Sequence, residues 1–98
     1  MRFMPKVTAF KLPGLDLWFY SDDHMPPHLH AEKSGDWELR VFFLRHPDDM
    51  IEVIYSNKPR RPSKADLKKL KANAEKYRVE LLEEWESKVH ATGPGTER

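Results

Sequence analysis

The sequence predicts a single α+β domain, with an antiparallel meander sheet of four or five strands and one long C-terminal helix packed on one face. Three observations lead to this fold class: β-rich alternating segments in the first half of the chain, turns that contain Pro and Gly between them, and one apolar stripe at helical spacing near the end. The 98 residues, 39% of them hydrophobic, suffice for one modest core and are too few for two.

Four segments are predicted to form the strands, because apolar and polar side chains alternate in them and turn residues bound them. These segments are 15–20, 29–32, 37–44 and 50–55. Each follows the previous one after a connection without helical character, so the sheet is expected to be an antiparallel meander. The pattern leaves open whether residues 6–10 add a fifth strand.

The hairpin between the second and third strands has a predictable register. The apolar positions of the two strands share one face only if the loop between them has an odd number of residues. A loop of three residues, 34–36, meets this condition and places Ala31 opposite Leu39 and His30 opposite Arg40. The histidines of this hairpin are therefore expected on the face that points away from the helix.

A long helix is expected after the proline-containing segment that ends at residue 62. Ser63 is a good N-cap, and Asp66 stands three residues later as in an acidic capping box. Apolar side chains then recur every three or four residues, at Leu67, Leu70, Ala74, Tyr77, Leu81 and Trp85. This spacing predicts one helix of roughly 25 residues, ending near His90, whose apolar face covers the sheet.

Composition excludes several classes of protein and site. The chain has no cysteine, which excludes disulfides, thiolate zinc sites and cysteine nucleophiles. No apolar run approaches the ~20 residues of a membrane span, and the N-terminus lacks the apolar core of a signal peptide. We expect a cytoplasmic protein without a membrane partner, in which residues 1–91 form the domain and 92–98 a disordered tail.

Three of the five histidines lie within seven residues, on both sides of Pro26-Pro27. The two prolines fix their φ angles near −65°, so the imidazoles of His24, His28 and His30 are displayed from a stiff loop that is not helical. A dense group of imidazoles in such a loop is typical of a site.

The first hypothesis for this loop is a metal site. A His-x-His pair on a strand points both rings to one face, and His24 would complete a three-histidine site with an open position for zinc or manganese. Asp22 or Asp23 would serve as a further ligand or as an acceptor behind one. The fixed charge of Arg40, opposite His30 in the predicted register, disfavours a nearby dication.

The second hypothesis is cleavage of a phosphodiester such as RNA, which needs no cofactor. Two imidazoles among His24, His28 and His30 would act as base and acid, while Arg40 or Arg61 would stabilise the charge that develops on phosphorus. This chemistry needs the basic part of the chain to adjoin the histidine loop.

The third hypothesis is an interaction module without catalysis. Residues 57–71 contain seven bases and one acid, a net charge of +6. The basic side chains predicted to contact phosphate, nucleic acid or an acidic protein are Lys58, Arg60, Arg61, Lys64 and Lys68. In this hypothesis the histidines only hydrogen-bond within their loop, and the basic segment or exposed aromatic residues of the outer sheet face bind the partner.

A resemblance to a known family rests on three motifs. They are Asp23-His24-x-Pro26-Pro27-His28-x-His30, the opening Met4-Pro5-Lys6-Val7, and Tyr77-x-x-Glu80-Leu81-Leu82-x-x-Trp85. Over nearly its whole length the chain resembles the small bacterial family called domain of unknown function 4160. The resemblance implies uncharacterised biochemistry, a role as a component of a toxin-antitoxin pair, and a small antitoxin-like partner protein. Leu29, where the family commonly has Phe, and a longer charged section over 45–49 depart from its pattern.

Overall fold

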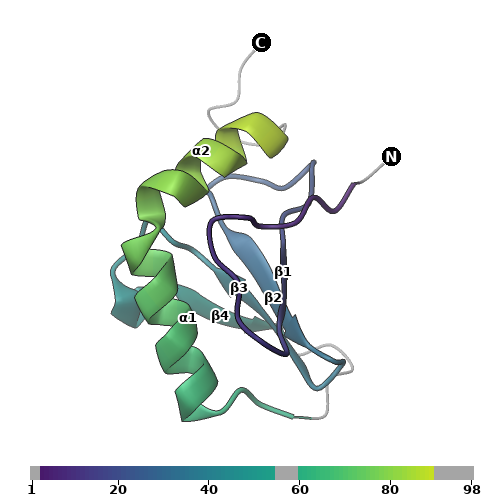
Figure 1. Ribbon diagram of the computed structural model, residues 1–98, viewed down its shortest axis with the longest axis vertical. Coiled ribbons are helices and arrows are strands. Elements are labelled where there is room, and N and C mark those ends of the chain that lie inside the picture. The colour runs from purple at the N-terminus through teal and green to yellow at the C-terminus, as the bar shows by residue number, and fades with distance from the viewer. Residues whose placement is uncertain (1–2, 55–59, 90–98) are drawn as a thin grey trace.

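The computed structural model describes residues 3–54 and 60–89, which form an antiparallel sheet followed by two helices (Figure 1). The four strands lie in the order β1-β2-β3-β4. The elements are β1 (Asp16–Trp18), β2 (Leu29–Lys33), β3 (Trp37–Val41), a 3-10 helix η1 (Pro47–Asp49), β4 (Ile51–Ile54), α1 (Lys64–Lys76) and α2 (Arg78–Lys88). The predicted α+β fold with a meander sheet is confirmed.

The register of the central hairpin is also as predicted. Ala31 pairs with Leu39 and His30 pairs with Arg40 across β2 and β3. The loop between the strands contains three residues, and Gly35 adopts a φ of 80° in it, a left-handed conformation that glycine tolerates without steric cost. The alternation of apolar and polar residues therefore determines which side chains share a face of this hairpin.

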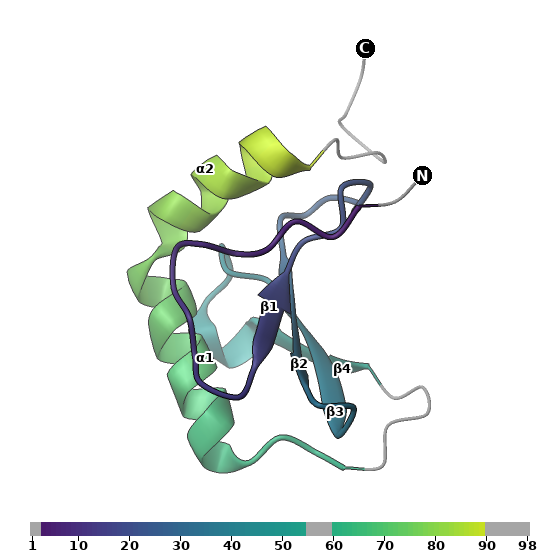
Figure 2. The same cartoon turned by 45° about the vertical axis from the view of Figure 1, so that its right-hand side comes forward.

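The N-terminal segment runs beside the edge strand β1 without forming a regular strand (Figure 2). Lys6 forms one isolated bridge with Trp18, so residues 6–10 do not add a fifth strand. β1 stops at Trp18, short of the predicted end at residue 20. From there the backbone pairs with the N-terminal segment, and the amide of Phe19 donates to the carbonyl of Pro5 at 2.8 Å.

The third strand is shorter than predicted as well, ending at Val41 instead of residue 44. The amide of Arg45 donates to the carbonyl of Phe42 at 3.0 Å, which turns the chain toward η1. β4 ends at Ile54, and the last residue of its predicted range lies outside the described residues. A local turn hydrogen bond thus follows β3 in a segment where composition alone predicts a longer strand.

The C-terminal helix begins as predicted but is divided in two. The hydroxyl of Ser63 accepts a hydrogen bond from the amide of Asp66 at 3.0 Å, which caps α1. Tyr77 leaves helical geometry, with φ −102° and ψ 24°, and its ring stacks on Phe10. The single long helix of the prediction is therefore α1 and α2, and the change of direction between them carries α2 over the upper end of the sheet (Figures 1 and 2).

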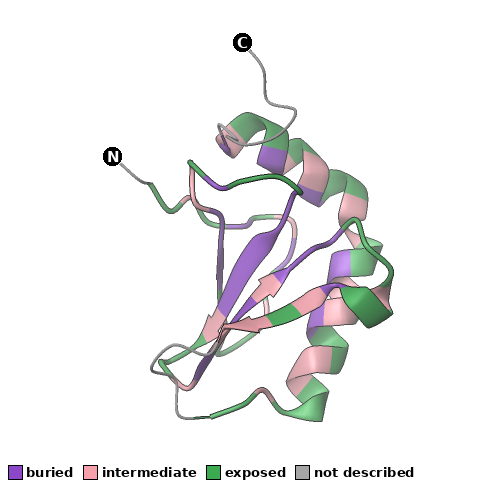
Figure 3. Cartoon of the chain, turned by 180° about the vertical axis from the view of Figure 1, so that it is seen from behind, coloured by how far each residue is buried: buried purple, intermediate pink, exposed green. Residues whose placement is uncertain are grey.

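The core lies between one face of the sheet and the two helices (Figure 3). Its fully buried side chains include Leu29, Ala31, Leu39, Val41, Leu70, Ala74 and Leu81. These are the alternate strand positions and the helical stripe that the sequence pattern assigns to the interior. Among the helices of the described residues, none is long and apolar enough to cross a bilayer.

Candidate metal centre

The side chains of Asp23, His28 and His30 meet in a buried group at one end of the sheet. Nε2 of His30 lies 3.0 Å from Oδ2 of Asp23, and Nε2 of His28 lies 3.6 Å from Oδ1 of the same carboxylate. One nitrogen or oxygen atom from each residue falls within 4.8 Å of the others. All three residues are more than nine-tenths buried. In the parts of the chain that the structure describes, this is the group with the geometry of a metal site.

Backbone hydrogen bonds fix Asp23 at the end of β1. The amide of Tyr20 donates to Oδ2 of Asp23 at 3.0 Å, and the amide of Asp23 donates to the carbonyl of Tyr20 at 3.1 Å. The Pro26-Pro27 pair then leads the chain back to β2, with a cis peptide bond before Pro26. His28 stands just before β2 and His30 within it, so a turn and a strand start bring the three side chains together.

Aromatic rings surround both histidines. The ring of His30 stacks on Trp18, with centroids 5.5 Å apart, and contacts the edge of Tyr20. The ring of His28 lies 5.0 Å from Phe42 and 5.6 Å from Trp85 of α2. The prediction that both histidines are separated from the helix is therefore wrong for His28, because α2 reaches over the end of the sheet where this residue enters β2.

The carboxyl group of Asp23 is ionised despite its burial. Burial by itself raises the pKa of Asp23, because it penalises the charged form. The ring nitrogens of His28 and His30 and the amide of Tyr20 stabilise the carboxylate, and their combined effect holds the pKa of Asp23 well below its usual range. The group therefore contains a buried negative charge at neutral pH.

A hydrogen bond places one ring hydrogen of His28. Its Nδ1 lies 2.9 Å from the carbonyl oxygen of Pro26, which can only accept, so Nδ1 carries the hydrogen. In the neutral ring, Nε2 then has a lone pair, and it faces an oxygen of Asp23. A cation therefore belongs in this space, either a hydrogen on Nε2, through which His28 donates to Asp23, or a metal ion between the two residues. A backbone carbonyl behind the ring is also the usual support of a metal-binding histidine.

Arg40 does not oppose a cation at this site as strongly as the sequence indicated. Its guanidinium Nη1 donates to Oε1 of Glu52 on β4, so a carboxylate balances its charge. Both side chains are about half exposed, at 43% and 53%, whereas His30 is buried. The register pairs Arg40 with His30, but the arginine charge is directed to its neighbour on β4.

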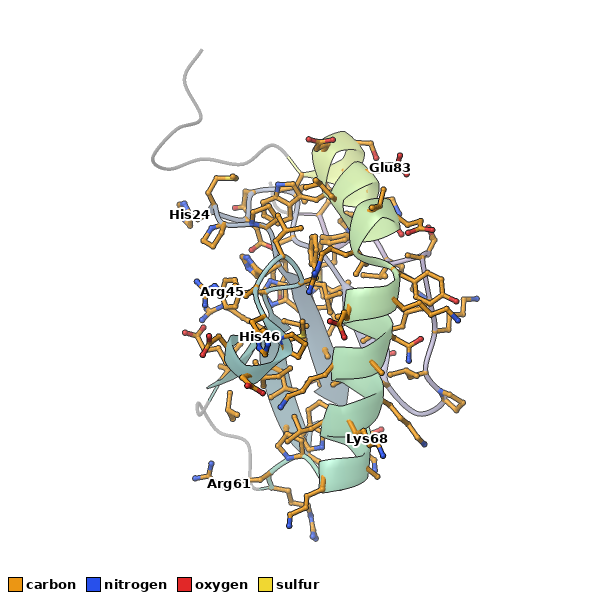
Figure 4. The ribbon with its side chains drawn as sticks, turned by 90° about the vertical axis from the view of Figure 1, so that its left-hand side faces the viewer. His24, Arg45, His46, Arg61, Lys68 and Glu83 are labelled. Atoms are coloured by element: carbon orange, nitrogen blue, oxygen red, sulfur yellow. The ribbon has the colours of Figure 1, made fainter. Side chains whose placement is uncertain are left out.

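His24, predicted as a ligand and as a catalytic residue, lies outside the buried group. It is exposed at the rim of the loop, and Figure 4 shows its ring at the periphery of the molecule. It lines the same cavity as His28 and His30 without belonging to the three residues that could hold an ion. Asp23 takes its place. Asp23 is one of the two aspartates that the sequence predicts as a further ligand or acceptor.

The basic segment is not brought to the histidines. Arg60 donates its amide to the carbonyl of Asp36 at 2.9 Å and forms an ion pair with the same residue. Asp36 lies in the loop between β2 and β3, at the opposite end of β2 from His30. Figure 4 shows Arg61 and Lys68 at the end of the molecule away from His24. Lys64 is the first residue of α1, and Lys58 lies outside the described residues.

Comparison with known proteins gives a family without an assigned function. A family model described as "Domain of unknown function (DUF4160)" matches residues 14–86, a range that contains the whole sheet and the buried group. No curated protein and no solved structure matches the chain.

Proposed function

We propose that this chain, which belongs to the family of domain of unknown function DUF4160, binds a divalent transition metal through Asp23, His28 and His30. The observation that carries the proposal is the pairing of His28 and Asp23. The hydrogen bond from Nδ1 to Pro26 directs Nε2 at an ionised carboxylate, and a metal ion held by both residues would take the place of a hydrogen on Nε2.

The observed distances suit such an ion. Zinc holds nitrogen and oxygen ligands at ~2.0–2.2 Å, so neighbouring ligand atoms of a tetrahedral site stand roughly 3.3–3.5 Å apart. From one oxygen of Asp23, Oδ1, the Nε2 atoms of His30 and His28 lie 3.3 and 3.6 Å away, close to that separation. Two imidazoles and one carboxylate form a donor set typical of zinc and of other first-row metals with an open position. Zinc is the first candidate and manganese the second.

An open coordination position would make hydrolysis the natural reaction class. A zinc ion with three protein ligands supplies an activated water and polarises a substrate oxygen. A cavity of about 440 Å³ adjoins the three residues, and it is lined also by Arg40 and Arg45. A phosphodiester, RNA included, fits a cavity with these charges. The role in a toxin-antitoxin pair with a small partner protein, and the cytoplasmic location, stay predictions.

The metal-free version of this reaction has less support. An acid-base pair must present a ring nitrogen to the substrate. In His28, Nδ1 is engaged by Pro26 and Nε2 faces Asp23, while in His30 Nε2 is engaged by Asp23. Both rings are more than nine-tenths buried. Neither imidazole presents an accessible nitrogen, so a metal is the more direct way for this group to act on a substrate.

The test is the metal content of the purified, untagged protein, measured by elemental mass spectrometry. We expect about one equivalent of zinc or manganese in the wild type and none in a His28→Ala/His30→Ala double variant. His46→Ala is the matched control, because His46 is exposed and contacts Asp48 of η1, outside the buried group. Asp23→Asn is a second variant, since the amide keeps the size of the side chain and its acceptor oxygen but removes the charge.

The outcomes are separable from loss of fold. Far-ultraviolet circular dichroism of each variant establishes whether it is folded. A folded Asp23→Asn protein should bind zinc at least tenfold more weakly than the wild type, as loss of a charged ligand predicts. A wild type that takes up no metal after incubation with zinc or manganese would contradict the proposal.

A further inference from the structure

Two arginines, Arg40 and Arg45, line the cavity beside the buried group, and their guanidinium groups have different neighbours. The guanidinium of Arg40 forms an ion pair with Glu52. The guanidinium of Arg45 lies 4.0 Å above the centroid of the Phe42 ring, and it has no ion pair with a carboxylate among residues 3–54 and 60–89. No acid among the described residues therefore balances the positive charge of Arg45.

Contacts from two directions hold Arg45 in place. Its amide donates to the carbonyl of Phe42, and its carbonyl accepts from Nη2 of Arg78 at 3.0 Å. Nε of Arg78 also donates to the carbonyl of Phe43 at 2.6 Å. Arg78 is the first residue of α2, so the helix fixes the backbone of the loop that carries Arg45. A fixed backbone reduces the entropy that the side chain loses when it binds a ligand.

A chain of ring contacts places this guanidinium at the histidine end of the cavity. Arg45 stacks on Phe42, and the Phe42 ring lies 5.0 Å from the ring of His28. Figure 4 shows Arg45 and His24 projecting on the same side of the molecule. The carboxylates that line this cavity besides Asp23 are Glu38 and Glu52. Glu52 is paired with Arg40, and Glu38 lies further along β3, two residues beyond Arg40 from the histidines.

We infer that this cavity binds a phosphate group, with one oxygen directed to the metal and others to the guanidinium of Arg45. The inference rests on the proposed metal site. An unpaired guanidinium beside a site with an open coordination position is suited to a tetrahedral oxyanion, because its planar fork donates two parallel hydrogen bonds to two oxygens. A carboxylate ligand offers fewer oxygens to share between the two cations.

The experiment is calorimetric titration of inorganic phosphate into protein that carries one equivalent of zinc and has been freed of excess zinc by gel filtration. We expect Arg45→Ala to weaken phosphate binding at least tenfold, as loss of a charge-assisted hydrogen bond predicts. Arg45→Lys should fall between the two, because lysine keeps the charge and loses the fork. The matched control is Lys11→Ala, which removes one exposed positive charge outside this cavity and should bind phosphate as the wild type does.

The zinc content of each sample distinguishes the two proposals. If zinc-loaded wild type and zinc-loaded Arg45→Ala bind phosphate with the same affinity, or if the wild type binds no phosphate, the phosphate inference is overturned. The metal site is then unaffected. Wild type that holds no zinc overturns the metal site and the phosphate position that depends on it. Both proposals are supported if zinc-loaded Arg45→Ala loses phosphate binding while zinc-loaded Lys11→Ala retains it.

Discussion

The two ends of strand β2 differ in the burial of their charged groups. At the histidine end, Asp23 is buried and contacts two imidazoles and a backbone amide. At the hairpin end, Asp36 meets Arg60 at 3.8 Å, with side chains 40% and 74% exposed. Solvent screens the second pair, whereas burial strengthens the first. The described part of the basic segment thus lies at an exposed surface, and the histidine-rich segment contains the buried group.

The largest expected effect is the loss of Asp23. In Asp23→Ala, His28 and His30 keep their burial and lose the carboxylate that their Nε2 atoms face. We expect the free energy of unfolding in urea to fall by about 3 kcal/mol, because a buried polar partner is removed without replacement. Asp36→Ala, the matched change at the hairpin end, should cost less than about 1 kcal/mol. Equal losses in the two variants would contradict the difference between the two ends.

A second, smaller effect should come from Arg78, which joins α2 to the loop after β3. Arg78→Ala removes the hydrogen bonds to the carbonyls of Phe43 and Arg45. We expect a loss of roughly 1–2 kcal/mol in urea unfolding, since hydrogen bonds to a charged donor are worth more than neutral ones. Arg78→Lys keeps the charge and only part of the geometry, so its stability should lie between. A wild-type midpoint in Arg78→Ala would show that the loop is held by other contacts.

The same contrast explains what the sequence could predict. The hairpin register followed from residues 29–41 because a period of two and an odd loop leave one solution. Ser63 was recognisable as a cap because its role depends on its neighbours in sequence. Both features are local, and the strand pattern and helical stripe that define the fold class are local as well.

The composition of the site was less predictable. Asp23 and His24 are adjacent in an irregular loop, where no periodicity determines which side chain points inward. In the structure Asp23 is the buried residue of the two, and its hydrogen bonds with Tyr20 hold it there. The sequence also could not show that the basic segment lies far from the histidines. That distance depends on how the sheet and α1 are placed relative to each other, which is a property of the whole fold.

The exposure of the Glu84 side chain lies between those of Asp23 and Asp36, the acids at the two ends of β2. Its substitution gives the smallest of the expected effects. Its side chain is 12% exposed. Burial by itself raises the pKa of Glu84, but the ammonium of Lys88 at 2.7 Å and the amide of Thr8 at 2.8 Å outweigh it and lower the pKa below the ordinary value of 4.5. These contacts join α2 to the N-terminal segment, since Lys88 also donates to the carbonyl of Lys6.

The direction of the pH dependence follows from that lowered pKa. A carboxyl group whose pKa is lower in the folded than in the unfolded state stabilises the fold at pH values above the unfolded pKa, and this contribution is lost as the pH falls through the folded pKa. We expect Glu84→Gln to be less stable than the wild type at pH 7, by up to about 1 kcal/mol, and the gap to narrow below pH 4.5. Urea unfolding of both proteins at pH 7 and at a pH below 4.5 measures this difference in stability. If the difference in free energy of unfolding stays constant or grows on acidification, Glu84 acts through packing and not through its charge. Among the acids compared, only Asp23, which is buried more deeply, would then stabilise the fold through its charge.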